Sequence, residues 1–378
     1  MNDSLKKYFH GDGVIWGVII ALSLISLLAV YSATGTLAYK YQHGNTNYYI
    51  LKHLTYMFIG LMITFVTHHI PYQLYSRLSQ LLLFLCIPLL GITLAFGTNL
   101  NQAQRWLTLP GLGLTIQTSD FAKLALIMYL ARLLSLKQED IKDFKKAFIP
   151  LLAPVALVCI LIFPANFSTA AILFFTSLVL MFIGRVKMKQ ILALVGIGVV
   201  LGGMFIGISL LTKHEGRIKV WQNRIEHFVS GESEDNFQAE QAKIAIATGG
   251  IIGKGPGNST QRNFLPHPYS DFIYAIIVEE YGLAGGLTIM FLYLWLLFRA
   301  GIIVRKSDRT FPAFLAIGLT VILVFQAMIN MAVAVNLFPV TGQTLPLVSM
   351  GGSSQLFTCF ALGIILSVSR PAKKAKRA

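Results

Sequence analysis

Residues 14–33 read VIWGVIIALSLISLLAVYSA, an apolar stretch without a single charged residue. A helix of this length, rising about 1.5 Å per residue, is long enough to cross a hydrocarbon core about 30 Å thick. Lys6 and Lys7 precede the stretch, but no small-residue cleavage site follows it. We therefore interpret it as an uncleaved membrane-spanning helix and not as a removed signal peptide.

Similar apolar blocks recur along the chain, which is 55% hydrophobic, 12% charged and has a mean hydropathy of +0.67. A soluble protein carries about 25% charged residues. The candidate spans are 14–33, 54–70, 79–97, 120–136, 148–163, 168–184, 190–211, 272–298, 311–333 and 354–370. These blocks predict an all-α polytopic membrane protein with about ten transmembrane helices, in which residues 1–378 form a single membrane domain.

The distribution of Lys and Arg predicts the orientation in the membrane. With a cytoplasmic N-terminus, the predicted inner segments collect most of the basic residues, and the short outer loops hold only Lys40, Lys52 and Arg105. We therefore expect both termini to be cytoplasmic, with residues 371–378 as a basic cytoplasmic tail. Residues 212–270, between the seventh and eighth predicted helices, then form one large extracytoplasmic loop.

The net charge of +15 is thus mainly a topology signal. Because the basic residues are divided among short inner loops and do not gather on one face, we predict no nucleic-acid binding. Cys86, Cys159 and Cys359 all fall inside predicted spans. We therefore expect no disulfide in an outer loop, and no Cys/His spacing indicates zinc.

The 212–270 loop contains one predicted amphipathic helix and one glycine-rich turn. Phe237, Gln241, Ile244 and Thr248 recur at spacings of three and four, ahead of a Gly-Gly stop. The segment GKGPG at 253–257 follows. Its backbone amides could approach an anion, or it could be a glycine-rich surface turn without a ligand.

Carboxylates stand at the mouth of the next predicted span and inside it. Asp271, at the mouth, could serve as a general base or could merely favour a helix N-terminus. Glu279 and Glu280 lie about two turns deeper. Adjacent helix residues point about 100° apart, so we expect at most one of the two to face a given partner. We also expect one of them to pair with a base in the interior.

Asp120 and Lys123 open the fourth span at an i, i+3 spacing that places both on one helix face. The two residues form either a structural ion pair or part of a site lining. Arg105, next to Trp106 in the preceding outer loop, could clamp a phosphate bidentately. The last outer loop, 339–354, is rich in Gly, Pro, Ser and Thr. Such irregular backbone at membrane depth lines a cavity or is buried in protein.

Three blocks of sequence carry a specific pattern. The first block joins Arg105-Trp106 to QTSDFAK at 117–123. The second block runs from QAEQ at 238–241 through GPGNSTQ at 255–261 to SDFIYAIIVEEYG at 270–282. The third block runs from PVTG at 339–342 through SMGGSS at 349–354 to Ser369-Arg370. In this order and topology they resemble the SEDS family of bacterial cell-wall polymerases, the FtsW/RodA type. The resemblance covers nearly the whole chain.

Two positions depart from the family pattern. The family usually has Gln-Pro-Ser-Glu where residues 117–120 read QTSD, which shortens the reach of the carboxylate toward Lys123. It typically has Glu-Ala-His-Thr-Asp where residues 267–271 read HPYSD. Asp271 is therefore kept, but His267 replaces the usual Glu.

The resemblance implies a peptidoglycan glycosyltransferase that polymerises lipid II at the outer face of the bacterial inner membrane. It implies Asp271 as the catalytic base of an inverting displacement. The growing charge of the diphosphate leaving group calls for cations. The residues selected for substrate binding are Arg105, Lys123, Lys243, Gln238, Gln241 and Ser353. The sequence requires no cofactor and assigns no metal ligand, although the chemistry allows a divalent cation, Mg²⁺ or Mn²⁺.

The resemblance also implies partners: other division proteins and a class B penicillin-binding transpeptidase, since no predicted outer loop contains Ser-x-x-Lys for cross-linking. The GPGNSTQ motif favours the division (FtsW) branch and septal wall synthesis over the elongation (RodA) branch. Two other classes of function stay open. One is a lipid II flippase or transporter, although no inverted repeat of broken helices is visible. The other is a membrane scaffold that only recruits a transpeptidase.

Overall fold

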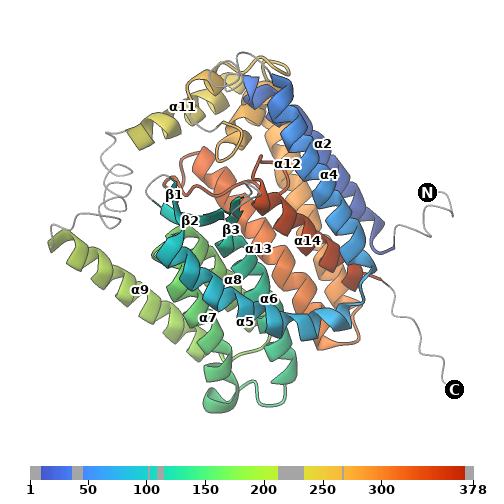
Figure 1. The fold of residues 1–378 in the computed structure, drawn as a ribbon, viewed down its shortest axis with the longest axis vertical. Coiled ribbons are helices and arrows are strands. Elements are labelled where there is room, and N and C mark those ends of the chain that lie inside the picture. The colour runs from blue at the N-terminus through green and yellow to red at the C-terminus, as the bar shows by residue number, and fades with distance from the viewer. Residues whose placement is uncertain are drawn as a thin grey trace.

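The computed structural model describes residues 10–35, 46–100, 103–108, 115–211, 234–265 and 268–370. Predictions that concern residues 212–233, His267 and the tail 371–378 lie outside these described residues. The described helices are α2 (Gly13–Ala33), α4 (Thr46–His69), α5 (Tyr72–Phe96), α6 (Thr118–Leu136), the π-helical turn η1 (Phe144–Phe148), α7 (Ile149–Ile162), α8 (Phe167–Ile183), α9 (Met188–Leu211), α11 (Glu234–Gly249), the 3-10 turn η2 (Gln261–Asn263), α12 (Ile273–Arg305), α13 (Thr310–Ala334) and α14 (Ser353–Val368) (Figure 1).

Each predicted apolar block coincides with one helix of the bundle. Among the described residues, the helices long and apolar enough to cross a membrane are α2, α4, α5, α7 with η1, α12 and α13. Shorter apolar helices are α8, α14 and the Met188–Gly198 part of α9. α6 belongs to neither group and carries Asp120, Lys123 and Arg132. The helical multi-span fold is confirmed, while the count of ten crossings stays a prediction.

Several helix boundaries differ from the sequence prediction. α4 and α5 begin at Thr46 and Tyr72, not at 54 and 79, and α12 continues past 298 to Arg305. The reason is that an apolar block marks only the part of a helix that lies in hydrocarbon or in the protein interior. The backbone hydrogen-bond ladder continues through polar turns on either side of that part.

The core of the bundle surrounds α13, which is the most deeply buried of the long apolar helices. Small residues let its neighbours approach closely: a Cβ on Gly318 would lie 2.9 Å from Ile127 of α6. α14 lies against α4 in the same way. A Cβ on Gly363 would lie 1.7 Å from Oγ1 of Thr67, so any larger residue would force the two helices apart.

The bundle has two ends that matter for function. α6, α12 and α14 begin, and α13 ends, at the end that we call the Asp271 end. We call the opposite end, where α12 ends and α13 begins, the Arg309 end. There the amide nitrogen of Asp12 donates to Oγ of Ser369 over 2.8 Å, and the carboxylate of Asp12 pairs with Arg299. Residues 12 and 369 therefore lie at the same end, as an even number of spans requires.

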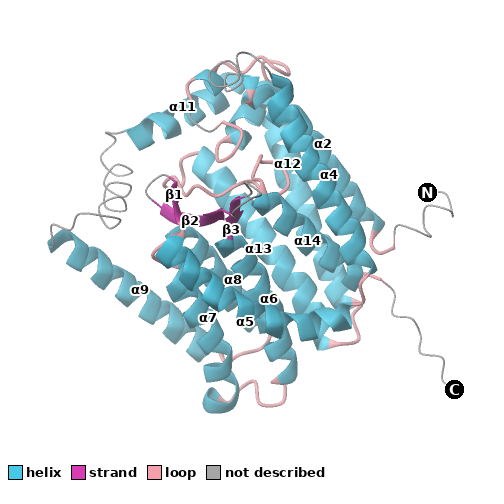
Figure 2. Cartoon of the chain, viewed as in Figure 1, coloured by secondary structure: helices cyan, strands magenta, loops and turns pink. Residues whose placement is uncertain are grey.

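A small antiparallel sheet interrupts the helical architecture at the Asp271 end (Figure 2). Its strands are β1 (Thr98–Leu100), β2 (Ala103–Thr108) and β3 (Thr115–Gln117), in the order β1-β2-β3. Trp106 of β2 lies opposite Gln117 of β3, and α6 begins directly after β3. This sheet, which no sequence pattern predicts, connects α5 to α6 and places Arg105.

Candidate active site

Asp271 lies in the turn directly before α12, and its side chain is half-buried. Oγ of Ser270 donates to Oδ1 of Asp271 over 2.9 Å. Nδ2 of Asn330, on α13, donates both to the backbone carbonyl of Asp271 over 2.8 Å and to that of Gln343 over 2.7 Å. Asn330 therefore fastens the turn that carries Asp271 to α13.

Arg105 reaches the same place from β2. Its Nε donates to the carbonyl oxygen of Ala165 over 2.8 Å. A Cβ on Gly342 would lie 3.6 Å from Nη1 of Arg105 and 3.7 Å from Oδ2 of Asp271. Gly342 has a φ of +65°, which a glycine adopts without strain. The fold therefore brings the predicted base, Asp271, and one predicted cation, Arg105, next to the same residue, Gly342.

The segment 336–352, between α13 and α14, is irregular, as the sequence predicts, and its residues 343 and 345–349 are buried. It holds the turn that carries Asp271. Oγ of Ser349 donates to the carbonyl of Ser270 over 2.6 Å, and the amide of Met350 donates to the carbonyl of Tyr269 over 3.0 Å. These bonds satisfy backbone groups that lipid could not.

Lys123 connects α6 to this segment. Its Nζ lies 2.7 Å from Oδ1 of Asp120 and 2.7 Å from Oε1 of Gln326. Nε2 of Gln326 in turn donates to the carbonyl of Thr344 over 2.9 Å. The i, i+3 ion pair is present, and Lys123 is only 7% exposed. In this position Lys123 supports the loop that contains Gly342; contact with substrate stays a prediction.

The other predicted binding residues lie on α14 and α11. Ser353, the first residue of α14, is buried and accepts a hydrogen bond from the amide of Gln117 over 3.1 Å. The first and third sequence blocks therefore meet beside Asp120 and Lys123. Gln238 and Gln241 are half-buried on α11, and Lys243 is exposed on the same helix. Their roles in binding stay predictions.

α11 forms where the sequence predicts an amphipathic helix and ends at the predicted glycines, but the predicted buried face is wrong. The side chains that it buries are those of Ala239, Ala242 and Ala245. Phe237 and Ile244 are 44% and 41% exposed. α11 lies so close to α12 that a Cβ on Gly249 would come 2.1 Å from the carbonyl oxygen of Val278. Only small residues fit such a contact, so the larger apolar side chains point outward.

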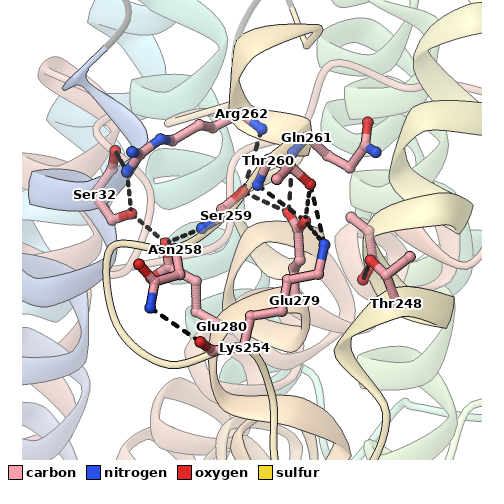
Figure 3. A network of polar contacts seen from close by, with 11 residues as sticks. Ser32, Thr248, Lys254, Asn258, Ser259, Thr260, Gln261, Arg262, Glu279 and Glu280 are labelled. Atoms are coloured by element: carbon pink, nitrogen blue, oxygen red, sulfur yellow. Dashed lines mark hydrogen bonds and ion pairs between the residues drawn. The ribbon is translucent and has the colours of Figure 1, made fainter.

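The glycine-rich loop after α11 encloses a carboxylate of the protein itself (Figure 3). Glu279, fully buried in α12, accepts hydrogen bonds from Nζ of Lys254 at 2.5 Å, Oγ of Ser259 at 2.5 Å, the amide and Oγ1 of Thr260 at 3.0 and 2.8 Å, and the amide of Gln261 at 3.2 Å. The loop does bind an anion through backbone amides, and that anion is Glu279. The ion pair with Lys254 confirms that one of the two glutamates pairs with a base.

Glu280 completes the network from the neighbouring helix position. It accepts hydrogen bonds from the amide of Ser259 over 3.2 Å and from the hydroxyl of Ser32 on α2. Arg262 donates to the carbonyl and hydroxyl oxygens of Ser32 at 3.1 and 3.0 Å. Ser259 therefore contacts both glutamates, and the expectation that at most one would face a given partner is wrong. Ser259 donates its hydroxyl to the carboxylate of Glu279 and its backbone amide to that of Glu280.

Backbone contacts explain the glycines in this block. The amides of Lys254 and Gly255 donate to the carbonyls of Glu279 and Glu280, each over 2.9 Å. A Cβ on Gly253 would lie 2.2 Å from the carbonyl oxygen of Glu280. α12 itself breaks at Gly282, which has a φ of 66° and a ψ of −171°. The loop thus packs into a break in the helix, where only glycine fits.

One group of three candidate metal ligands exists among the described residues: His10, His68 and His69. It lies at the Arg309 end, since α4 ends there and the carbonyl of His69 accepts a hydrogen bond from Arg370. Within the described part of the chain, Asp271 belongs to no such group.

The profile of a family described as "Cell cycle protein", that of FtsW, RodA and SpoVE, matches residues 12–374. The chain belongs to the FtsW/RodA/SpoVE family. The match covers every described helix, and the family together with the apolar helices makes the chain a multi-pass protein of the bacterial inner membrane.

Curated relatives in this family match over nearly their full length. The chain is 34% identical to "Probable peptidoglycan glycosyltransferase FtsW" of Trichlorobacter lovleyi, over 99% of this chain and 98% of the relative. It is 35% identical to "Stage V sporulation protein E" of Bacillus subtilis, over 93% of this chain and 96% of the relative.

Solved structures share the fold. One, described as "Structural coordination of polymerization and crosslinking by a peptidoglycan synthase complex", is similar with a TM-score of 0.73 at 23% identity, over 95% of this chain and 97% of that one. The rod shape determining protein RodA of Thermus thermophilus is similar with a TM-score of 0.67 at 22% identity, over 96% and 98%.

Proposed function

We propose that this protein is a peptidoglycan glycosyltransferase that polymerises lipid II into glycan strands, in the service of septal wall synthesis during cell division. The family supports this function, as do relatives that carry the name of a probable peptidoglycan glycosyltransferase. The structural observation that carries it is the placement of Asp271 and Arg105 beside Gly342. A proton acceptor and a cation are the two groups that glycosyl transfer from a diphosphate needs.

The proposed orientation puts the Asp271 end at the outer face of the membrane and both termini in the cytoplasm. The excess of Lys and Arg in the connections at the Arg309 end supports this orientation. A substrate with a polyprenyl tail stays in the bilayer, because each buried CH₂ contributes about 0.8 kcal/mol. The reacting sugars would then meet Asp271 at the lipid–water boundary.

In the proposed reaction the acceptor sugar hydroxyl transfers its proton to the carboxylate of Asp271. The hydroxyl oxygen attacks the anomeric carbon of the donor, and the bond from that carbon to the diphosphate breaks with inversion. The polyprenyl diphosphate leaves with the electron pair of the broken bond. A positioned base contributes about 10²–10⁴-fold to such a step.

The guanidinium of Arg105 is the proposed partner of the diphosphate, because its planar fork matches phosphate oxygens and it lies beside Gly342 together with Asp271. Lys123 is proposed to act through the loop 339–354, which it holds by way of Gln326. Ser353 would then keep the start of α14 in register with β3, while Gln238, Gln241 and Lys243 would contact substrate from α11.

For a divalent cation, Mg²⁺ or Mn²⁺, the residues described at this site offer one carboxylate, that of Asp271, so substrate phosphates would have to supply further ligands. Magnesium is usually bound through one or two carboxylates together with substrate phosphates. Asp120, the other carboxylate of this network, is buried against Lys123. We propose that cationic side chains, and not a metal, balance the charge of the diphosphate. Polymerisation that persists in excess EDTA would support this assignment.

We propose a class B penicillin-binding transpeptidase as partner, together with other division proteins. One solved structure with this fold is described as a complex that coordinates polymerisation and crosslinking, which supports a transpeptidase partner. Assignment to the division branch is supported by relatives named FtsW from several bacteria. The elongation branch is the alternative within the family.

The test of function uses purified protein with its cognate transpeptidase, incubated with lipid II in detergent and, separately, in vesicles. The proposal predicts glycan chains in both settings. Translocation of lipid II across the vesicle membrane without polymer would overturn it in favour of a flippase. Neither polymer nor translocation, with normal transpeptidase recruitment, would overturn it in favour of a scaffold.

A further inference from the structure

A cavity lies at the Arg309 end, far from Asp271 along the helices. It occupies about 610 Å³ between the first turns of α5, the last turns of α6 and the start of α13. This volume is in the range of about 300–1,000 Å³ typical of sites for small molecules. No step of glycosyl transfer at the Asp271 end uses this cavity.

The lining of the cavity is strongly basic. Arg77 of α5, Arg132 of α6 and Arg309 before α13 surround it, and Asp308 is its one acidic lining residue. Among the described residues, no carboxylate lies within ion-pair distance of any of the three arginines. Three like charges around one hollow repel one another, and an anion in the hollow would offset that repulsion.

The cavity is built from fixed groups. Arg132 is half-buried, and its Nη1 donates to the carbonyl of Ser76 over 2.6 Å, which joins α6 to α5. The hydroxyls of Ser135 and Thr310 lie 2.6 Å apart and join α6 to α13. A guanidinium fork can bind phosphate oxygens bidentately, and a hydroxyl group can donate a hydrogen bond to them.

We propose that this cavity binds the phosphate headgroup of an anionic phospholipid from the adjoining leaflet. The cavity lies where α6 ends and α5 and α13 begin, which is where we expect the lipid headgroups to meet the bundle. Arg77 and Phe84 occupy one face of α5 at an i, i+7 spacing, and Phe84 is 75% exposed. A headgroup at Arg77 would therefore leave its acyl chains running along an apolar helix face. Basic pockets between transmembrane helices bind anionic headgroups in this way.

Native mass spectrometry of the full-length protein tests this proposal. The protein is purified through an affinity tag other than polyhistidine and equilibrated with phosphatidylglycerol, phosphatidylethanolamine and phosphatidylcholine in equal amounts. We expect preferential retention of phosphatidylglycerol by the wild type. The double variant Arg77→Gln/Arg309→Gln should lose this retention by roughly tenfold or more, since each arginine near a membrane surface contributes about fivefold. Both residues are exposed, so the variant should fold.

Arg305→Gln is the matched control, because Arg305 is exposed at the same end but does not line the cavity. It should retain phosphatidylglycerol like the wild type. The proposal would be overturned if the double variant retained as much phosphatidylglycerol as the wild type. It would also be overturned if Arg305→Gln lost as much phosphatidylglycerol as the double variant. In a second arm, inorganic phosphate is added as a competitor at a concentration on the order of 10 mM. Complete displacement of the lipid by this concentration would identify a site for soluble phosphate and would also overturn the proposal. The outcome is independent of lipid II polymerisation.

Discussion

Nη1 of Arg105 and Oδ2 of Asp271 lie beside the same residue, Gly342, although one comes from β2 and the other from the turn before α12. Neither group is free to drift: the arginine is tied to Ala165 and the backbone of the aspartate is tied to Asn330. A donor sugar diphosphate at this glycine would have a base and a cation within reach.

Arg105→Gln should slow lipid II polymerisation by about 10²–10³-fold, the usual cost of removing one group that stabilises developing negative charge. Arg105→Lys keeps the charge but loses the planar fork and the bond from Nε to Ala165, so its rate should be intermediate. The measurement is the initial rate of glycan formation. A near wild-type rate for Arg105→Gln would remove Arg105 from the site.

Lys123→Met should destabilise the protein by about 3–5 kcal/mol, because it leaves Asp120 charged and buried without a partner. The double variant Asp120→Asn/Lys123→Met removes both charges and should recover most of the unfolding temperature in detergent. If the double variant also recovers polymerisation, the hydrogen bond from Lys123 to Gln326 is not needed for activity, which would contradict the proposed role of Lys123. Recovery of stability without activity would show that the reaction itself needs Lys123, as the proposal expects.

Glu279→Gln should loosen the loop 254–262. The carboxylate accepts hydrogen bonds from Lys254, Ser259, Thr260 and Gln261, and loss of its charge should cost about 1.5–3 kcal/mol. Trypsin should then cleave after Lys254 faster than in the wild type. Glu139→Gln, at an exposed position, is the control and should leave the cleavage rate unchanged. Unaltered cleavage in Glu279→Gln would mean that the loop is held by other contacts.

Gly253→Ala and Gly257→Ala separate close packing from backbone strain. Both glycines have positive φ, at +90° and +77°, so an alanine at either costs about 1–2 kcal/mol. At Gly253 the new Cβ would also lie 2.2 Å from the carbonyl of Glu280, whereas at Gly257 nothing lies within 4 Å. Gly253→Ala should therefore abolish folding or lower the unfolding temperature far more than Gly257→Ala. Similar losses in the two variants would contradict the packing of the loop into the break in α12.

The sequence was sufficient to predict the features that depend on neighbouring residues, namely the positions of helices and contacts within one helix. Uninterrupted apolar blocks located the helices of the bundle, and Asp271 was expected at the mouth of the span that begins at Ile273. The i, i+3 spacing of Asp120 and Lys123 was enough to foresee their contact, because neighbouring turns of one helix fix it.

Contacts between distant segments were not visible in the sequence. The approach of Arg105 to Asp271 depends on a sheet whose strands are three to six residues long, too short for a clear alternating pattern. The buried face of α11 was misjudged because alanines and a glycine, and not its larger apolar residues, pack on α12. A helix that docks by close backbone contact buries its smallest side chains.

The most direct test of the central claim is the initial rate of lipid II polymerisation by Asp271→Asn, measured with the cognate transpeptidase. Asp140→Asn is the matched control, because Asp140 is exposed at the Arg309 end. If Asp271 accepts the proton of the acceptor hydroxyl, Asp271→Asn should lose about 10²–10⁴-fold in rate while keeping the wild-type unfolding temperature. Asp140→Asn should polymerise normally. A folded Asp271→Asn protein that polymerises at the rate of Asp140→Asn would contradict the account.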